Sequence, residues 1–194
     1  MTTSAHGHGH GHGHVPVVPV LALTGPVGVG KSAVAGEASD ILRGLSIAHA
    51  LVDMDYLRRC YPRPADDPHH TALGLRNLAA VWANYQAAGA ERLIIVDIVE
   101  TRSSVAGYRS AVPGADILVV RLNAGLPVIH RRLQGRDTGQ SLRWHLHRAG
   151  ELLRLWQEQP VEDLLIETEG KEVGDVAREV LARTGWAAPD TGHQ

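Results

Sequence analysis

The 194-residue chain has a single cysteine, no long apolar run and a small net charge, and each of these features excludes a class of protein. Its single cysteine, Cys60, cannot form an internal disulfide, which predicts a reducing, cytoplasmic environment. No apolar run reaches the roughly 18 residues that would span a bilayer. A net charge of -2 argues against the basic face that nucleic-acid binding needs. We therefore expect a soluble protein that binds neither membranes nor nucleic acids.

The two ends of the chain differ in composition from the part between them. Residues 6–14 alternate histidine with glycine, which is typical of a flexible tail, either natural or added for purification. The tail is expected to cover residues 1–15, and residues 187–194 are expected to form a flexible C-terminus. The remaining residues 16–186 are long enough for one domain with a full core.

Within this domain, short apolar runs alternate with segments of helical periodicity. The run at 92–99 is the most apolar, and we expect it to lie centrally in a parallel sheet that is buried on both faces. The pattern predicts an α/β three-layer sandwich with a mostly parallel sheet of five strands. The expected strands are 17–24, 46–53, 92–99, 116–122 and 162–168. The expected helices are 31–45, 71–88, 103–111, one opening at Pro127, a long one running on toward Gln157, and 172–184; a long loop is expected at 56–70.

The eight residues from Gly25 to Ser32 match the phosphate-loop pattern G-x-x-x-x-G-K-[S/T] without a mismatch. The expected strand before them and helix after them are the context that this loop requires. Lys31, one of only two lysines, can reach the β- and γ-phosphates, and the Ser32 hydroxyl can ligate magnesium. The glycines let backbone N–H groups point at an anion, and the following helix directs its positive end to it. The predicted nucleotide contacts are Gly25, Val27, Gly28, Val29, Gly30, Lys31, Ser32 and Ala33.

Carboxylates follow the second and third expected strands. Asp53 and Asp55 stand two residues apart, so both would point the same way from an extended chain. One could hold hydrated magnesium while the other accepts a proton from an attacking hydroxyl. Asp97 fits a carboxylate that holds magnesium through water, and Glu100 is a candidate second site carboxylate. Solvated or capping carboxylates are the alternative interpretation of these positions.

Arginines are concentrated in the segment that follows the fourth expected strand. Arg131, Arg132 and Arg136 lie where a lid would close, with a glycine on each side of Arg136 as candidate hinges. A closing arginine would stabilise charge on the γ-phosphate and exclude water. We expect a lid around residues 131–150, with Arg132 and Arg136 in the catalytic roles. The alternative is a solvated basic helix face.

Together these motifs resemble the P-loop small-molecule and nucleotide kinases over residues 17–184, most clearly the adenylylsulfate kinases, with shikimate and gluconate kinases further off. The Asp-x-Asp after strand two, an arginine three residues on and an Arg-Asn pair in the next helix carry the resemblance. It implies a sheet order of 2-3-1-4-5, ATP and Mg²⁺ as cofactors, and an adenine ring packed at 167–170. The implied acceptor residues are Asp53, Asp55, Arg58, Arg76, Asn77, Glu100 and Arg102.

The leading hypothesis is an ATP-dependent kinase that phosphorylates a hydroxyl or phosphate group of a small molecule. Asp55 would be the base, Lys31 with the lid arginines would stabilise charge, and Ser32 with Asp53 or Asp97 would hold magnesium. The chain differs from adenylylsulfate kinases in its "DIVETR" segment, its lack of phenylalanine for an aromatic clamp and its arginine-built lid. The acceptor is therefore left open among nucleotide-like, sugar-like and natural-product molecules.

Two other functions stay open, and so does a homodimer. The histidine-rich tail before a phosphate loop would suit a GTP-driven metal-insertion protein, although the chain has no Asn-Lys-x-Asp motif and no Asp-x-x-Gly after Asp97. A regulatory or toxin-like nucleotide-binding protein that phosphorylates a sugar nucleotide or an antibiotic would have the same fold and donor site.

Overall fold

The computed structural model describes residues 16–63, 65–135 and 137–187. Five parallel strands form one sheet in the order β2-β3-β1-β4-β5, which confirms the predicted order. β3 lies between β2 and β1, and all four of its residues are buried. The strands are β1 (Val18–Thr24), β2 (Ala50–Asp53), β3 (Leu93–Val96), β4 (Ala115–Asn123) and β5 (Leu164–Glu167).

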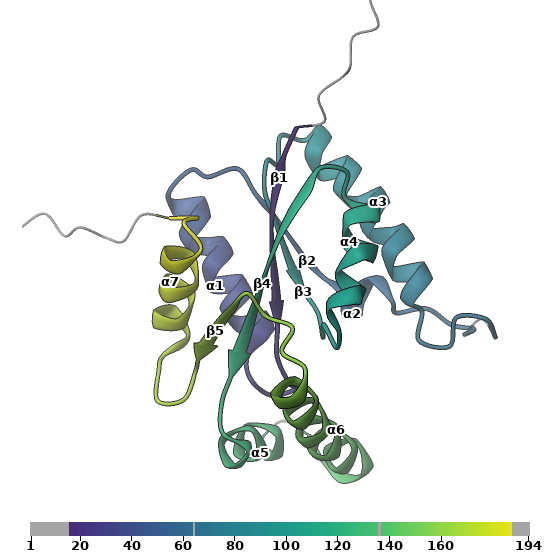
Figure 1. Ribbon diagram of the computed structural model, residues 1–194, viewed down its shortest axis with the longest axis vertical. Coiled ribbons are helices and arrows are strands. Elements are labelled where there is room, and N and C mark those ends of the chain that lie inside the picture. Colours follow the sequence, from purple (N-terminus) through teal and green to yellow (C-terminus); the bar gives the residue numbers. More distant parts are fainter. Residues whose placement is uncertain (1–15, 64, 136, 188–194) are drawn as a thin grey trace, which may run out of the picture.

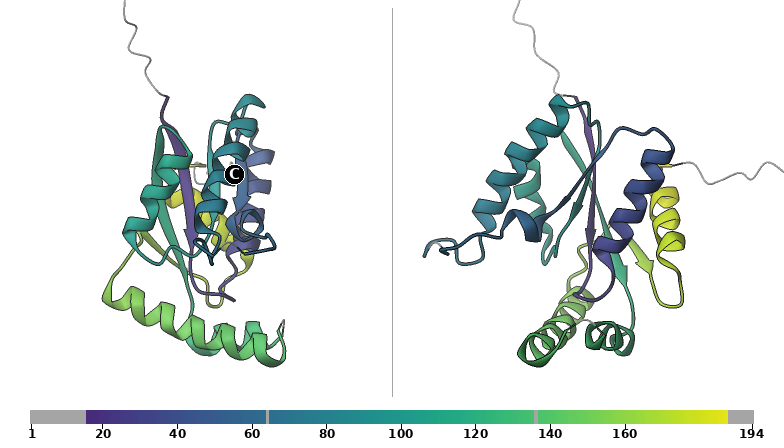
Figure 2. Two further views of the ribbon diagram at one scale, coloured as in Figure 1. Left: turned by 90° about the vertical axis from the view of Figure 1, so that its right-hand side faces the viewer. Right: turned by 180° about the vertical axis from the view of Figure 1, so that it is seen from behind.

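Helices cover both faces of the sheet and its lower end (Figure 1). α1 and α7 lie on one face, and α3 with α4 lies on the other. α5 and α6 lie beyond the ends at which the strands finish, and Figure 2 shows α6 running across that end of the sheet. The helices are α1 (Lys31–Gly44), α2 (Met54–Leu57), α3 (Thr71–Ala87), the 3-10 turn η1 (Arg102–Ser104), α4 (Val105–Ala111), α5 (Leu126–Gln134), α6 (Gly139–Glu158) and α7 (Val173–Arg183).

The expected loop at 56–70 is partly wrong, because its first two residues belong to the short helix α2. Asp53 caps that helix through its side chain, which accepts a hydrogen bond from the backbone N–H of Asp55 at 3.0 Å. The sequence DMDYL therefore turns directly from strand into helix. Aspartate is a preferred residue at the start of a helix, so Asp53 was a possible helix signal. The apolar run before it indicated a strand, and the helix start was therefore not predicted.

Two apolar clusters hold the layers together, one on each face of the sheet. β1 contributes to both, because alternate side chains of a strand point to opposite faces. Trp82 of α3 and Trp156 of α6 are among the largest fully buried side chains. No helix in the described part of the chain is long and apolar enough to cross a membrane. The cores thus fix the strand ends from which the polar residues of the site extend.

Candidate active site

The phosphate loop after β1 has a backbone that only glycine adopts easily. Gly25, Gly28 and Gly30 have φ angles of 145°, 86° and 106°. A Cβ on Gly25 would lie 2.6 Å from the Leu122 carbonyl oxygen, and one on Gly28 would lie 2.8 Å from Leu133 Cγ. Gly30 immediately precedes α1 in a left-handed conformation. The loop therefore needs glycine at its first positions both for conformation and for lack of space.

The first turn of α1 carries the polar groups of the phosphate loop. The Lys31 ammonium donates hydrogen bonds to the carbonyl oxygens of Gly25 at 2.8 Å and Pro26 at 3.3 Å, so it lies across the start of the loop. Ser32 and Ala33 are exposed, whereas Val29 is buried and Val27 is half-buried. This exposed helix N-terminus is suited to an anion, because its N–H groups lack helical partners.

Ser32 and Asp53, two of the predicted magnesium ligands, meet across the site. The Ser32 hydroxyl donates to Asp53 Oδ2 at 2.9 Å, although the residues lie 21 positions apart in the chain. The expectation that Asp53 and Asp55 share one side of a strand is wrong, because Asp55 lies in the first turn of α2. Asp55 is exposed there, and Asp53 is half-buried. α2 therefore sets the direction of Asp55.

Asp97 follows β3 and is almost completely enclosed by donors. Arg58 donates to both of its carboxylate oxygens, at 2.6 and 2.5 Å, and the backbone N–H of Ile98 donates at 2.7 Å. The buried Tyr108 hydroxyl donates to Oδ2 as well. Each oxygen thus has two donors. The structure gives Asp97 a bidentate ion pair where the sequence predicted a magnesium ligand, and Ser32 with Asp53 is the predicted metal pair that it brings together.

Burial and charge fix the ionisation of this cluster. Burial disfavours the charge on Arg58, yet hydrogen bonding to Asp97 and its negative charge outweigh that effect and raise the pKa of Arg58. Burial, together with the charge of Asp97, raises the pKa of the Tyr108 hydroxyl well above its usual value. At neutral pH Arg58 is therefore charged, and Tyr108 is a neutral hydrogen-bond donor.

The Arg58 side chain also depends on a glycine in α3. A Cβ on Gly74 would lie 2.8 Å from Arg58 Cγ, so Gly74→Ala is expected to push Arg58 away from Asp97. Overpacking of about 1–3 kcal/mol would exceed the roughly 1 kcal/mol that alanine adds to helix stability. Urea unfolding should show a net loss for Gly74→Ala. Gly36→Ala in α1 is the control, because its Cβ meets nothing within 4 Å and should stabilise; equal effects of the two changes would contradict this packing.

Most of the other predicted acceptor residues already have partners within the protein. Asn77 donates to the Leu57 carbonyl oxygen at 2.7 Å and ties α3 to α2, while Arg76 is exposed. Glu100 accepts a hydrogen bond from Arg148 of α6. Arg102 pairs with Asp163 before β5, with one contact at 3.0 Å. Their roles toward an acceptor stay predictions.

Arg132 connects three parts of the donor side. Its guanidinium donates to the carbonyl oxygen of Val29 in the phosphate loop at 2.9 Å, and to the Thr168 hydroxyl and carbonyl oxygens at 3.2 and 3.3 Å. The segment 167–170, where the resemblance places adenine, is thus joined to the phosphate loop through α5. Arg131 is exposed, and Arg136 lies outside the described residues.

Two contacts of the candidate site could not be foreseen from the sequence. Tyr108 lies in an ordinary helical pattern, and only the fold brings its hydroxyl to Asp97. Arg148 reaches Glu100 across 48 residues of chain. Among the described residues, no group of three or more His, Cys, Asp or Glu side chains could hold a metal ion on its own. A metal held by Ser32 and Asp53 would need further oxygen ligands, as Mg²⁺ usually takes from water and phosphates.

The parallel 2-3-1-4-5 sheet, with a phosphate loop between β1 and α1, defines the P-loop kinase fold. No family model matches the chain, and no curated protein matches it.

Solved structures share this fold along nearly their whole length. The tunicamycin resistance protein of Deinococcus radiodurans has a TM-score of 0.64 at 20% identity, over 87% of this chain and 96% of that one. A sugar kinase from Janibacter sp. HTCC2649 has a TM-score of 0.59 at 19% identity, over 92% and 100%. The APS kinase of Mycobacterium tuberculosis, in complex with AMPPNP and APS, has a TM-score of 0.54 at 21% identity, over 88% and 99%. The chain is therefore similar in fold to P-loop small-molecule kinases.

Proposed function

We propose that this protein transfers the γ-phosphate of ATP to a hydroxyl or phosphate group of a small molecule. The observation that carries the proposal is the phosphate loop, in which glycines hold the backbone open, Lys31 lies across the loop and Ser32 contacts Asp53. Phosphoryl transfer depends on positioning and on charge stabilisation, and these groups provide both.

On the donor side, Lys31 exchanges its contacts with the loop carbonyls for the β- and γ-phosphates. The Ser32 hydroxyl and the Asp53 carboxylate would hold Mg²⁺, because both offer oxygen ligands and these oxygens already lie 2.9 Å apart. When bound, the ion neutralises charge that develops on the phosphate oxygens. Asp97 contributes to this site indirectly, because its ion pair with Arg58 holds the Arg58 side chain in position.

On the acceptor side, Asp55 is the general base. Its exposed carboxylate, in the turn next to Asp53, accepts the proton as the acceptor oxygen attacks the γ-phosphorus. The bond from that phosphorus to the bridging oxygen breaks, and ADP leaves. When the acceptor group is a phosphate without a proton, no general base is needed, and the arginines of the acceptor side bind its negative charge instead.

The lid, around residues 131–150, consists of the end of α5 and the first part of α6. Arg132, with its contacts to the phosphate loop and to Thr168, lies beside the donor site and stabilises transferred charge together with Arg136. The adenine packs against residues 167–170. A lid that excludes water is important because water is a competing acceptor.

The acceptor is held by Arg58, Arg76, Asn77, Glu100 and Arg102, several of which must give up an internal partner to bind it. The neighbours in fold include a sugar kinase, a gluconokinase, a shikimate kinase and an APS kinase. Their names suggest polyhydroxylated or anionic acceptors, and the tunicamycin resistance protein suggests a hydroxylated antibiotic.

The test is ADP release from MgATP across a panel of acceptors. The panel contains gluconate, shikimate, adenylylsulfate, nucleosides and tunicamycin, with GTP tested in place of ATP. We expect one class of acceptor to raise ADP release at least about tenfold above the rate with water alone. No stimulation by any acceptor, or a clear preference for GTP, would contradict the proposal and favour a GTP-driven or regulatory role.

A further inference from the structure

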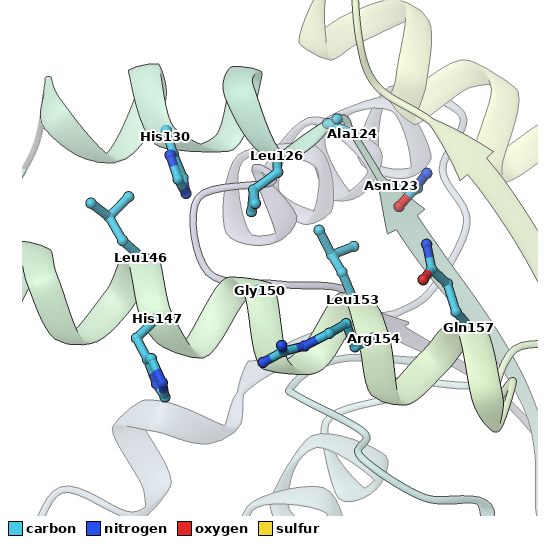
Figure 3. A pocket seen from close by; sticks show the side chains of 11 residues that line it. Asn123, Ala124, Leu126, His130, Leu146, His147, Gly150, Leu153, Arg154 and Gln157 are labelled. Atoms are coloured by element: carbon cyan, nitrogen blue, oxygen red, sulfur yellow. The ribbon is translucent and has the colours of Figure 1, made fainter.

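A hollow of about 690 Å³ lies between α5 and α6, beside the end of β4 (Figure 3). Its size is in the range of small-molecule pockets. No residue of the phosphate loop, and none of the predicted acceptor residues, lines it. The lining residues are Asn123, Ala124, Gly125, Leu126, His130, Leu146, His147, Gly150, Leu153, Arg154 and Gln157.

The centre of the hollow is apolar, and its edge is basic. Leu126 from α5 and Leu146 and Leu153 from α6 point into the space between the helices, and Leu126 is 36% exposed. His130 points from α5 toward α6, and Arg154 lies along α6 at the rim. None of the lining residues is a carboxylate. Leu146 and Leu153 are half-buried against the core, and an apolar group that covered the remaining exposed surface of the three leucines would gain free energy.

Three polar side chains of the lining have no partner among the residues that the structure describes. In the described part of the chain, no hydrogen bond or ion pair involves the side chains of His130, Arg154 or Gln157. By contrast, Arg148 on the opposite side of α6 pairs with Glu100 and Glu151. His147 points away from α5 and lies 3.6 Å from Glu151. The donors that face the hollow are thus available to a ligand.

Gly150 keeps the floor of the hollow open. It lies in the middle of α6, where glycine costs roughly 1 kcal/mol of helix stability relative to alanine. A Cβ at Gly150 would meet no atom within 4 Å, so packing does not require glycine there. A larger side chain at this position would fill the space between the leucines.

We propose that this hollow binds a small anionic molecule with an apolar body. The body would cover the three leucines, and a carboxylate or phosphate head group would bind Arg154 and His130. The site is separate from the phosphate loop, yet α5 forms one wall and also carries Arg132. This inference does not depend on the kinase reaction.

The test is isothermal titration calorimetry with two probes, phenyl phosphate and phenylacetate, which separate the two head groups. A non-hydrolysable ATP analogue with Mg²⁺ is present at saturation, so that the phosphate loop is filled. Inorganic phosphate tests the head group alone and should bind more weakly than phenyl phosphate. The wild-type chain should bind at least one of the two aromatic probes.

Two variants locate the binding, and each has a matched control. Arg154→Ala should weaken binding at least about tenfold, because a hydrogen-bonded charge is lost, while Arg178→Ala on α7 should leave it unchanged. Gly150→Leu should abolish binding, while Gly150→Ala, which removes the glycine but leaves most of the space, should retain it. Circular dichroism and thermal unfolding confirm that each variant folds. No binding to the wild type, or binding unchanged in both Arg154→Ala and Gly150→Leu, would overturn the proposal.

Discussion

Replacing Asp97 with alanine is expected to lower the free energy of unfolding by about 3–5 kcal/mol, which is the usual loss when one partner of a buried ion pair is removed. Asp97 is 5% exposed and receives hydrogen bonds from Arg58, Tyr108 and the backbone N–H of Ile98. Without the carboxylate, the half-buried Arg58 would keep its charge and lose its hydrogen-bonded partner, leaving only the more weakly interacting Asp55 as a negative charge nearby. Urea unfolding, followed by circular dichroism, measures the loss.

A double-mutant cycle separates this pair from its surroundings. Arg58→Met removes the buried cation, so the double variant Arg58→Met/Asp97→Ala should lose clearly less than the sum of the two single losses. Tyr108→Phe removes one hydrogen bond to a charged group and should cost about 1.5–3 kcal/mol. Strictly additive losses for Arg58 and Asp97 would show that their contact contributes no coupling, and would contradict the described ion pair.

The second large effect is expected in the rate of phosphoryl transfer. Asp55→Ala should lower kcat by about 10²–10⁴-fold, the usual contribution of a positioned base. The dissociation constant for MgATP should change little, because Lys31 and the phosphate loop bind the nucleotide. Single-turnover kinetics with the best acceptor of the panel, together with an ATP-binding titration, measures both quantities.

Asp66, an exposed carboxylate in the loop before α3, is the control for this change. Asp66→Ala should leave both kcat and ATP binding unaltered, so that a loss at Asp55 reflects its position in α2. Turnover close to normal in Asp55→Ala would remove the base assignment. A loss of ATP binding in the same variant would move Asp55 to the donor side of the site.

Local patterns were sufficient for the α/β class and the phosphate loop, whereas the sheet order came from the family resemblance. β3 is a run of four apolar residues with all side chains buried, and such a run predicts an interior parallel strand from the sequence alone. The phosphate-loop motif from Gly25 to Ser32 is likewise one continuous segment, and its glycines have the positive φ angles that such a loop needs. Each of these features is contained within a few consecutive residues.

The partners of the site residues could not be predicted, because they come from distant parts of the chain. Arg58 meets Asp97 across 39 residues, and Arg102 meets Asp163 across 61. Both arginines were predicted to bind an acceptor on the basis of the family resemblance, which says nothing of internal carboxylates nearby. The prediction that Asp53 and Asp55 point the same way failed for another reason: Asp53 ends the strand and caps a helix that contains Asp55. The direction of Asp55 is therefore set by the helix that Asp53 caps, and not by the alternation of side chains along a strand.

The most direct test of nucleotide binding at the phosphate loop uses the only two lysines of the chain. Lys31 lies across the loop, whereas Lys171 pairs with Glu179 at 2.5 Å in an exposed ion pair. The dissociation constant for MgATP is measured by calorimetry for the wild type, Lys31→Ala and Lys171→Ala. We predict that Lys31→Ala weakens binding at least about tenfold, since charge-assisted phosphate contacts are lost, and that Lys171→Ala has no effect. Equal affinities for all three proteins would contradict a nucleotide site at this loop.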